Sequence, residues 1–205
     1  MITAAILGAI FFAAAGYAGA VVGLTLAERI EPLDDAPESG RPPIVVLIAA
    51  CASIGAIVTT GDISQMQFLL IAVICAVLVA IWVADVKRGI VPDALTLGPL
   101  ALLALIAIWQ HQWVFFISVA APFAPFAIAA ALSHGRGMGW GDVKLVALGG
   151  AVLGAEAAFL AFALACVAAV IVSFARGRRT GPIAFAPYLA AAIGLAIPIG
   201  VIWSV

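Results

Sequence analysis

The stretch GRGMGWGDVK, residues 135–144, places a glycine at every second position and then passes through Asp142 into a long apolar run. Glycine adopts backbone conformations that other residues avoid and lets another chain approach closely. Two interpretations follow: a flexible loop whose aspartate caps a helix, or one part of a functional site beside lipid. Which interpretation holds depends on whether a second carboxylate can meet Asp142.

The composition predicts an integral membrane protein. Of the 205 residues, 66% are hydrophobic and only 9% are charged, with a mean hydropathy of +1.29. A soluble globule of this size needs more polar surface. The net charge of −1 gives no reason to expect a nucleic-acid partner, so the expected surroundings are the lipid bilayer.

Cofactors and metals are not expected from the cysteines. Cys51, Cys75 and Cys166 are isolated inside apolar segments, without the paired spacing of a zinc site. We interpret all three as small core residues.

The apolar runs predict an all-α fold, a single transmembrane bundle over residues 1–205 with about eight membrane segments, one of them short. A helix needs roughly 20 apolar residues to cross a bilayer core. The predicted segments are 2–27, 44–59, 67–84, two within 94–133, 143–153, 157–175 and 182–203.

Three connections are distinctive. Residues 28–43 form an acidic, proline-rich loop, and residues 85–93 are predicted to be a short interfacial loop because Pro92 disfavours helix before it. Between 109 and 113, two tryptophans flank polar residues, which is typical of an aromatic belt at a membrane interface. His111 is therefore predicted to be a solvated turn residue.

The basic residues decide how residues 142–176 cross the membrane. If 143–153 and 157–175 are separate segments, every basic residue falls on one side, and the positive-inside rule makes that side cytoplasmic. A single long helix would instead place Arg176 and its neighbours outside. The first solution puts both termini outside and leaves 143–153 short, as a tilted helix buried in protein or in a locally thinned membrane. The nine basic residues are Arg29, Arg41, Lys87, Arg88, Arg136, Lys144, Arg176, Arg178 and Arg179.

This topology brings a second carboxylate to the level of Asp142. Asp85 ends the third segment and Asp142 begins the sixth, both at the cytoplasmic edge. Two such carboxylates can share a proton and activate water, as in aspartyl proteolysis. The helix dipole favours a charged Asp142 and a protonated Asp85, which predicts Asp142 as base and Asp85 as acid. The alternative is that both are ordinary interfacial caps. Lys87 and Lys144 are interpreted as interfacial anchors.

Three motifs resemble the type IV prepilin peptidase family of membrane aspartyl proteases. They are DVKRGIVPDALTL from Asp85, GWGDVKL from Gly139 and IAFAPY from Ile183. The second matches the family's GxGD motif. The resemblance implies that Asp85 and Asp142 are the catalytic aspartates and that Gly139 and Gly141 are motif glycines. It also implies removal of the basic leader from prepilin or pseudopilin precursors at the cytoplasmic face of the inner membrane.

The sequence departs from many members of this family in one respect, which narrows the part of the family that it resembles. Many relatives carry a four-cysteine zinc module after the first segment and also methylate the new terminus, whereas residues 28–43 contain no cysteine. The chain therefore resembles the short forms of Flp/Tad pili, and methyltransferase activity is not expected.

Several alternatives stay open. The acidic side chains of the 28–43 loop either attract the basic leader or are simply solvated. Other functions are a non-catalytic scaffold of a pilus or secretion system, or a small proton-coupled transporter, although no acidic residue lies in the middle of a segment. The acidic loop residues are Glu28, Glu31, Asp34, Asp35 and Glu38.

Overall fold

The computed structural model describes residues 2–29, 41–132, 138–175 and 185–198. Within these residues every regular element is a helix, which confirms the all-α prediction. The helices are α1 (Ile2–Arg29), α2 (Ile44–Val58), α3 (Gln65–Arg88), α4 (Asp93–Trp109), α5 (Val114–Leu132), α6 (Trp140–Leu153), α7 (Ala155–Ala175) and α8 (Ala186–Ala196).

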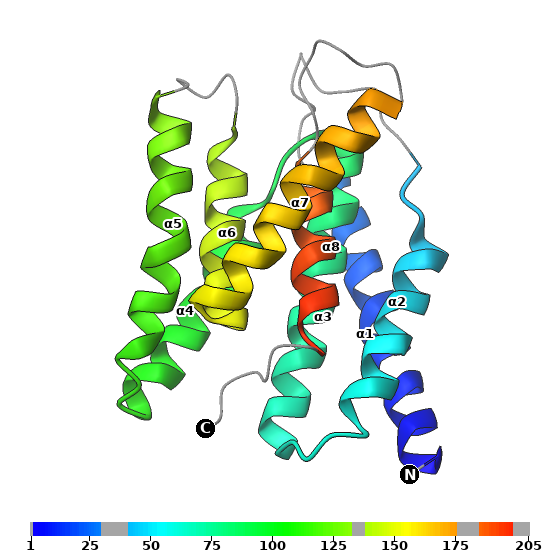
Figure 1. Ribbon diagram of the computed structural model, residues 1–205. Coiled ribbons are helices and arrows are strands. Elements are labelled where there is room, and N and C mark those ends of the chain that lie inside the picture. The colour runs from blue at the N-terminus through cyan, green and yellow to red at the C-terminus, as the bar shows by residue number, and fades with distance from the viewer. Residues whose placement is uncertain (1, 30–40, 133–137, 176–184, 199–205) are drawn as a thin grey trace.

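The helices run up and down between two ends of a bundle (Figure 1). Four of them, α1, α3, α5 and α7, are long and apolar enough to cross a membrane. The shorter helices α2, α4 and α8 are also apolar. Large hydrophobic side chains are exposed along the outer helices, as expected for a surface that faces lipid.

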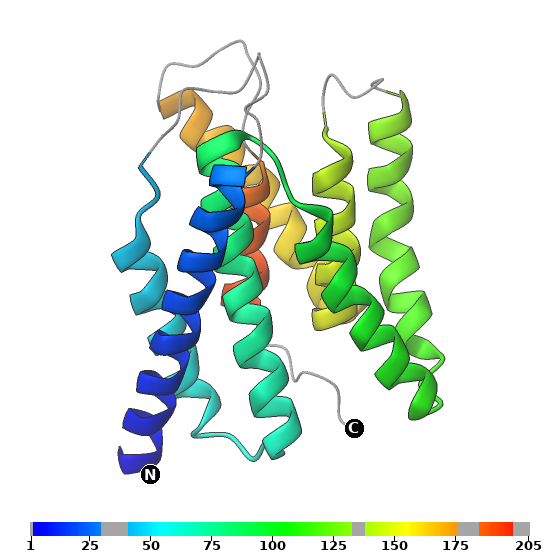
Figure 2. The same cartoon turned by 180° about the vertical axis from the view of Figure 1, so that it is seen from behind.

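The bundle consists of two groups of helices joined by α8. In the first group α1 packs against both α2 and α3, and in the second α6 packs against α4, α5 and α7. Helix α8 contacts α3, α6 and α7, whereas the backbones of α3 and α6 do not approach each other closely. Figure 2 shows the segment between α3 and α4 crossing from one group to the other.

The predicted interfacial loop at 85–93 is wrong in its first half. Helix α3 continues through Arg88 and ends at Gly89, whose left-handed φ of 67° turns the chain. Asp85 therefore lies in the last turn of the helix instead of beyond its end. The prediction missed this because charged residues lower hydropathy without interrupting helical hydrogen bonding. Likewise α1 extends to Arg29, so Glu28 is helical and not part of a loop.

The predicted division of residues 142–176 into two helices is confirmed. The chain breaks at Gly154, where φ is 79° and ψ is 165°, a conformation that is essentially confined to glycine. Helix α6 has only 14 residues, and its side chains from Leu145 to Leu153 are all buried by its neighbours. It is the short, protein-buried helix that the sequence predicted. Of the predicted last segment, 182–203, the structure describes a helix over Ala186–Ala196.

Close approach between α1 and α3 depends on glycine. A Cβ atom at Gly19 would overlap the backbone carbonyl of Ala76. We predict that Gly19→Leu lowers the free energy of unfolding by about 1–3 kcal/mol, because one of the two helices must move. Gly98→Leu is the matched control, since no atom lies within 4 Å of a Cβ there. Thermal unfolding in detergent measures both, and equal melting temperatures for the two variants would contradict this packing.

Candidate active site

Asp85 occupies the last turn of α3 and is one of the few buried polar residues of the bundle. Its exposed fraction is 5%, although it stands near the end of the helix. Its carboxyl Oδ2 is buried without a hydrogen-bond partner among the residues that the structure describes. Burial without a hydrogen bond disfavours the charged form of a carboxyl group, which suits an acid that holds its proton.

Asp142 occupies the first turn of α6. Gly139 is the N-cap of this helix, its carbonyl accepts the Asp142 amide at 3.1 Å, and its backbone also interacts with the Asp142 carboxyl. The side chain is partly exposed, in contrast to the fully buried residues that follow it in α6. A carboxylate in the first turn is favoured by the helix dipole.

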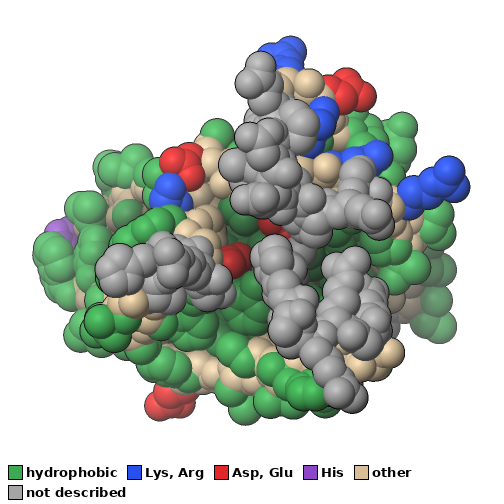
Figure 3. Space-filling model, turned by 90° about the horizontal axis from the view of Figure 1, so that it is seen from above, with side chains coloured by type: hydrophobic (Ala, Val, Ile, Leu, Met, Phe, Trp, Pro, Cys, Tyr) green, Lys and Arg blue, Asp and Glu red, His purple; other side chains and the backbone are tan. Residues whose placement is uncertain are grey.

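The two carboxyl groups lie near enough for Asp142 to act electrostatically on Asp85, although the backbones of the helices that carry them do not approach closely. Viewed onto the end of the bundle, acidic side chains are visible near the middle of the face (Figure 3). The structure thus brings together the two aspartates that the sequence singled out.

The two motif glycines have different surroundings. A Cβ at Gly141 would lie 2.9 Å from Cβ of Val91, in the segment that follows α3. Gly139 is exposed, and the nearest atom to a Cβ there is Oδ2 of Asp142 at 3.7 Å. Gly141 therefore allows a close contact within the protein, whereas Gly139 leaves open space beside the carboxylate.

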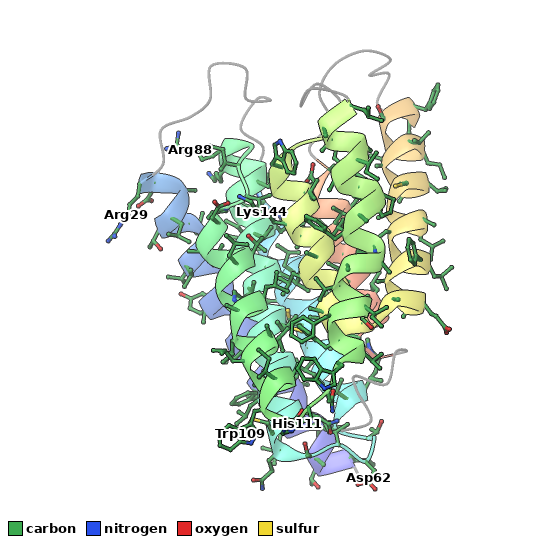
Figure 4. The ribbon with its side chains drawn as sticks, turned by 90° about the vertical axis from the view of Figure 1, so that its left-hand side faces the viewer. Arg29, Asp62, Arg88, Trp109, His111 and Lys144 are labelled. Carbon is green, nitrogen blue, oxygen red and sulfur yellow. The ribbon has the colours of Figure 1, made fainter. Side chains whose placement is uncertain are left out.

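Basic side chains gather at the same end of the bundle as the aspartates. Figure 4 shows Arg29, Arg88 and Lys144 at this end, and Asp62 and His111 at the other. Arg88 donates from Nε to the carbonyl of Ala27 at 2.6 Å and so ties the end of α3 to α1.

Lys144 takes part in an ion pair that the sequence analysis missed. Its Nζ lies 2.5 Å from Oδ1 of Asp93, the first residue of α4. We interpreted Lys144 only as an interfacial anchor, because no local pattern connects residues 51 positions apart. The one available signal was the Pro92-Asp93 pair, which is typical of a helix start and places a carboxylate at that end of α4.

Other predicted site residues are further from the aspartates or are not described. Glu28 is exposed near the end of α1, and Glu31, Asp34, Asp35 and Glu38 lie outside the described residues. His111 is exposed in its turn with a φ of 57°, as predicted for a turn residue. Cys51 and Cys75 are buried, but Cys166 is exposed on α7, so its assignment to the core was wrong. Across the described ranges no group of three or more His, Cys, Asp or Glu side chains could hold a metal ion.

Comparison with known proteins agrees with this geometry. The fold and the candidate site place the protein in a broad class: helical membrane proteins that carry a pair of aspartates at one end of the bundle. The model of the type IV leader peptidase family matches residues 72–174, which include both aspartates. The chain belongs to this family and is a multi-pass membrane protein.

Two kinds of relatives are similar to this chain in sequence: long proteins named leader peptidase/N-methyltransferase and a shorter one named leader peptidase. The prepilin leader peptidase/N-methyltransferase of Bacillus subtilis is 31% identical over 73% of this chain and 62% of its own length. The Burkholderia pseudomallei protein of the same name is 30% identical over 76% of this chain and 53% of its own length. Leader peptidase HopD of Escherichia coli is 31% identical over 63% of this chain and 90% of its own length.

The chain therefore spans between 53% and 62% of these two N-methyltransferase relatives but nearly all of the shorter one. No solved structure matches the chain.

Proposed function

We propose that this protein is a membrane aspartyl endopeptidase that removes the basic leader from prepilin or pseudopilin precursors. The observation that carries the proposal is the meeting of Asp85 and Asp142 from α3 and α6. It is supported by membership of the type IV leader peptidase family.

The two aspartates divide the chemistry between them. Asp142 accepts a proton from water, and the resulting hydroxide attacks the scissile carbonyl carbon. Asp85 donates its proton as the tetrahedral intermediate collapses, so that the peptide nitrogen leaves as a neutral amine. The positions favour this division, because Asp142 is partly exposed in a first helical turn and Asp85 is buried in a last one.

The active end of the bundle is proposed to face the cytoplasm. Arg29, Arg88 and Lys144 share this end, and positive charge collects on the cytoplasmic side of membrane proteins. With eight segments, including the short α6, both termini then lie on the opposite side of the inner membrane. A leader that remains in the cytoplasm would meet the aspartates directly.

Leader removal without methylation is the activity that we propose, as in Flp/Tad-type systems. Residues 28–43 contain no cysteine, and the mechanism needs neither a metal nor a cofactor, because two carboxyl groups supply both the base and the acid.

Cleavage should require both aspartates. Co-expression with prepilin precursors encoded in the same genome is expected to yield a mass loss equal to the leader, with no added methyl group. Asp85→Asn and Asp142→Asn should each reduce the rate by at least about 1,000-fold, because one proton-transfer group is lost. The control is Asp62→Asn at the other end of the bundle. Full cleavage by either active-site variant would refute the dyad mechanism.

Gly139 is proposed to leave room for an extended substrate beside Asp142, since its backbone is exposed and a Cβ there meets no other side chain closely. We predict that Gly139→Val slows cleavage about tenfold or more while the melting temperature stays unchanged. Gly141→Val should lower both the cleavage rate and the melting temperature, because the new side chain collides with Val91. Unaltered processing by Gly139→Val would count against a substrate role for this residue.

The acidic residues Glu28, Glu31, Asp34, Asp35 and Glu38 are proposed to attract the basic leader. Replacing all five by Gln or Asn should raise KM several-fold at low salt and by less at high salt, because salt screens such attraction. The maximal rate should not change. If KM is unchanged by the substitutions and by the salt concentration, these residues are merely solvated.

A further inference from the structure

The distance between the two carboxyl groups is not set by a close approach of the helix backbones that carry them. The backbones of α3 and α6 do not come close to each other. The segment 89–92 leaves α3 one turn after Asp85, crosses between the two groups of helices and begins α4 at Asp93 (Figure 2). Contacts between this crossing and α6 therefore help to place Asp142 relative to Asp85, together with α8, which contacts both helices.

Two contacts connect the crossing to the first turns of α6. Gly141 lies against Val91, and Lys144 pairs with Asp93 through Nζ and Oδ1 at 2.5 Å. On the other side, Arg88 bonds to the carbonyl of Ala27, so the end of α3 is held against α1. Both ends of the crossing are thus tied to helices near the aspartates.

Lys144 and Asp142 leave α6 in different directions. Residues two apart on a helix are separated by about 200° around its axis. Lys144 reaches the first residue of α4, while Asp142 interacts with Asp85 of α3. The ammonium group is engaged with Asp93.

We infer that Lys144 and Asp93 are positioning residues: their ion pair holds the start of α6 where Asp142 meets Asp85. This inference rests on the proposed function, because it explains how that dyad is assembled. Lys144 would act on the reaction only through Asp93 and the helix that carries Asp142.

Stability and catalysis should respond differently to loss of this pair. The side chains of Lys144 and Asp93 are 30% and 62% exposed. Ion pairs this exposed add little to stability. Catalytic geometry is more sensitive, since a displacement of about 1 Å can cost roughly 100-fold in rate. The expected signature is a lower kcat in a protein that melts normally.

The experiment measures kcat, KM and melting temperature of the full chain in detergent, with a prepilin precursor encoded in the same genome. Lys144→Met keeps the stem and removes the charge, and Asp93→Asn removes the partner's charge. Each should lower kcat about tenfold with KM within about threefold of wild type, and the double variant should be no worse than either single one.

Two further variants separate positioning from other roles. Lys144→Arg keeps the ion pair and should retain most of kcat, and the exchange Lys144→Asp with Asp93→Lys should recover at least about threefold over either single replacement. Lys87→Met is the matched control, because Lys87 also follows an aspartate by two residues and is expected to leave kcat near wild type. Should Lys144→Met unfold the protein, Asp93→Asn and the exchange still decide the question.

Two results would overturn the inference. A rise in KM with unchanged kcat in Lys144→Met, together with normal behaviour of Asp93→Asn, would assign Lys144 to leader binding. Additive losses without recovery in the exchange would mean that the two residues act separately. Asp85→Asn in the same assay distinguishes failure of the proposed dyad from failure of the positioning role. If Asp85→Asn cleaves normally, the proposed dyad fails. If Asp85→Asn is inactive while Lys144→Met has normal kcat, only the positioning role fails.

Discussion

The constraint on which this structure depends is that two carboxyl groups come near each other although the backbones of their helices do not approach closely. Asp85 lies in the last turn of α3 in one group of helices, and Asp142 lies in the first turn of α6 in the other. Direct packing would set their distance through many side chains. Here it depends on α8, which contacts both helices, and on the short crossing between α3 and α4.

The burial pattern explains how an acidic pair is tolerated in so apolar a chain. Asp85 is nearly inaccessible and leaves one carboxyl oxygen unpaired, which lowers stability unless the rest of the fold compensates. Apolar burial around Asp85 offsets this cost, since α6 is buried along most of its length and α3 is the most buried of the long helices. A short helix inside the bundle also brings Asp142 to the end of the protein, where the first turn of α6 is partly exposed.

The GxGD motif of this chain combines two physical roles. Only glycine fits at position 141 without displacing Val91, and this contact brings the crossing segment against α6. Gly139 has open space beside Asp142 and no such steric requirement. A motif that is read as a unit in sequence therefore divides into one glycine that serves assembly and one that is free to serve the substrate.

The sequence by itself determined the all-helical class, the approximate bounds of the apolar helices that the structure describes and the break at Gly154, and it singled out the two aspartates as candidates. These follow from local signals: hydropathy over a span, a glycine between two runs, and acidic residues at the ends of apolar segments. It misplaced the end of α3, because a polar last turn lowers hydropathy while its hydrogen bonds continue through Arg88.

Only the tertiary structure decided which surfaces meet. The pairing of Lys144 with Asp93 and the contact of Gly141 with Val91 join residues far apart in the chain. The wide separation of the α3 and α6 backbones is likewise a property of the tertiary structure. Hydropathy and helical periodicity carry no information about such contacts, since they describe how a segment meets its surroundings and not which segment it meets.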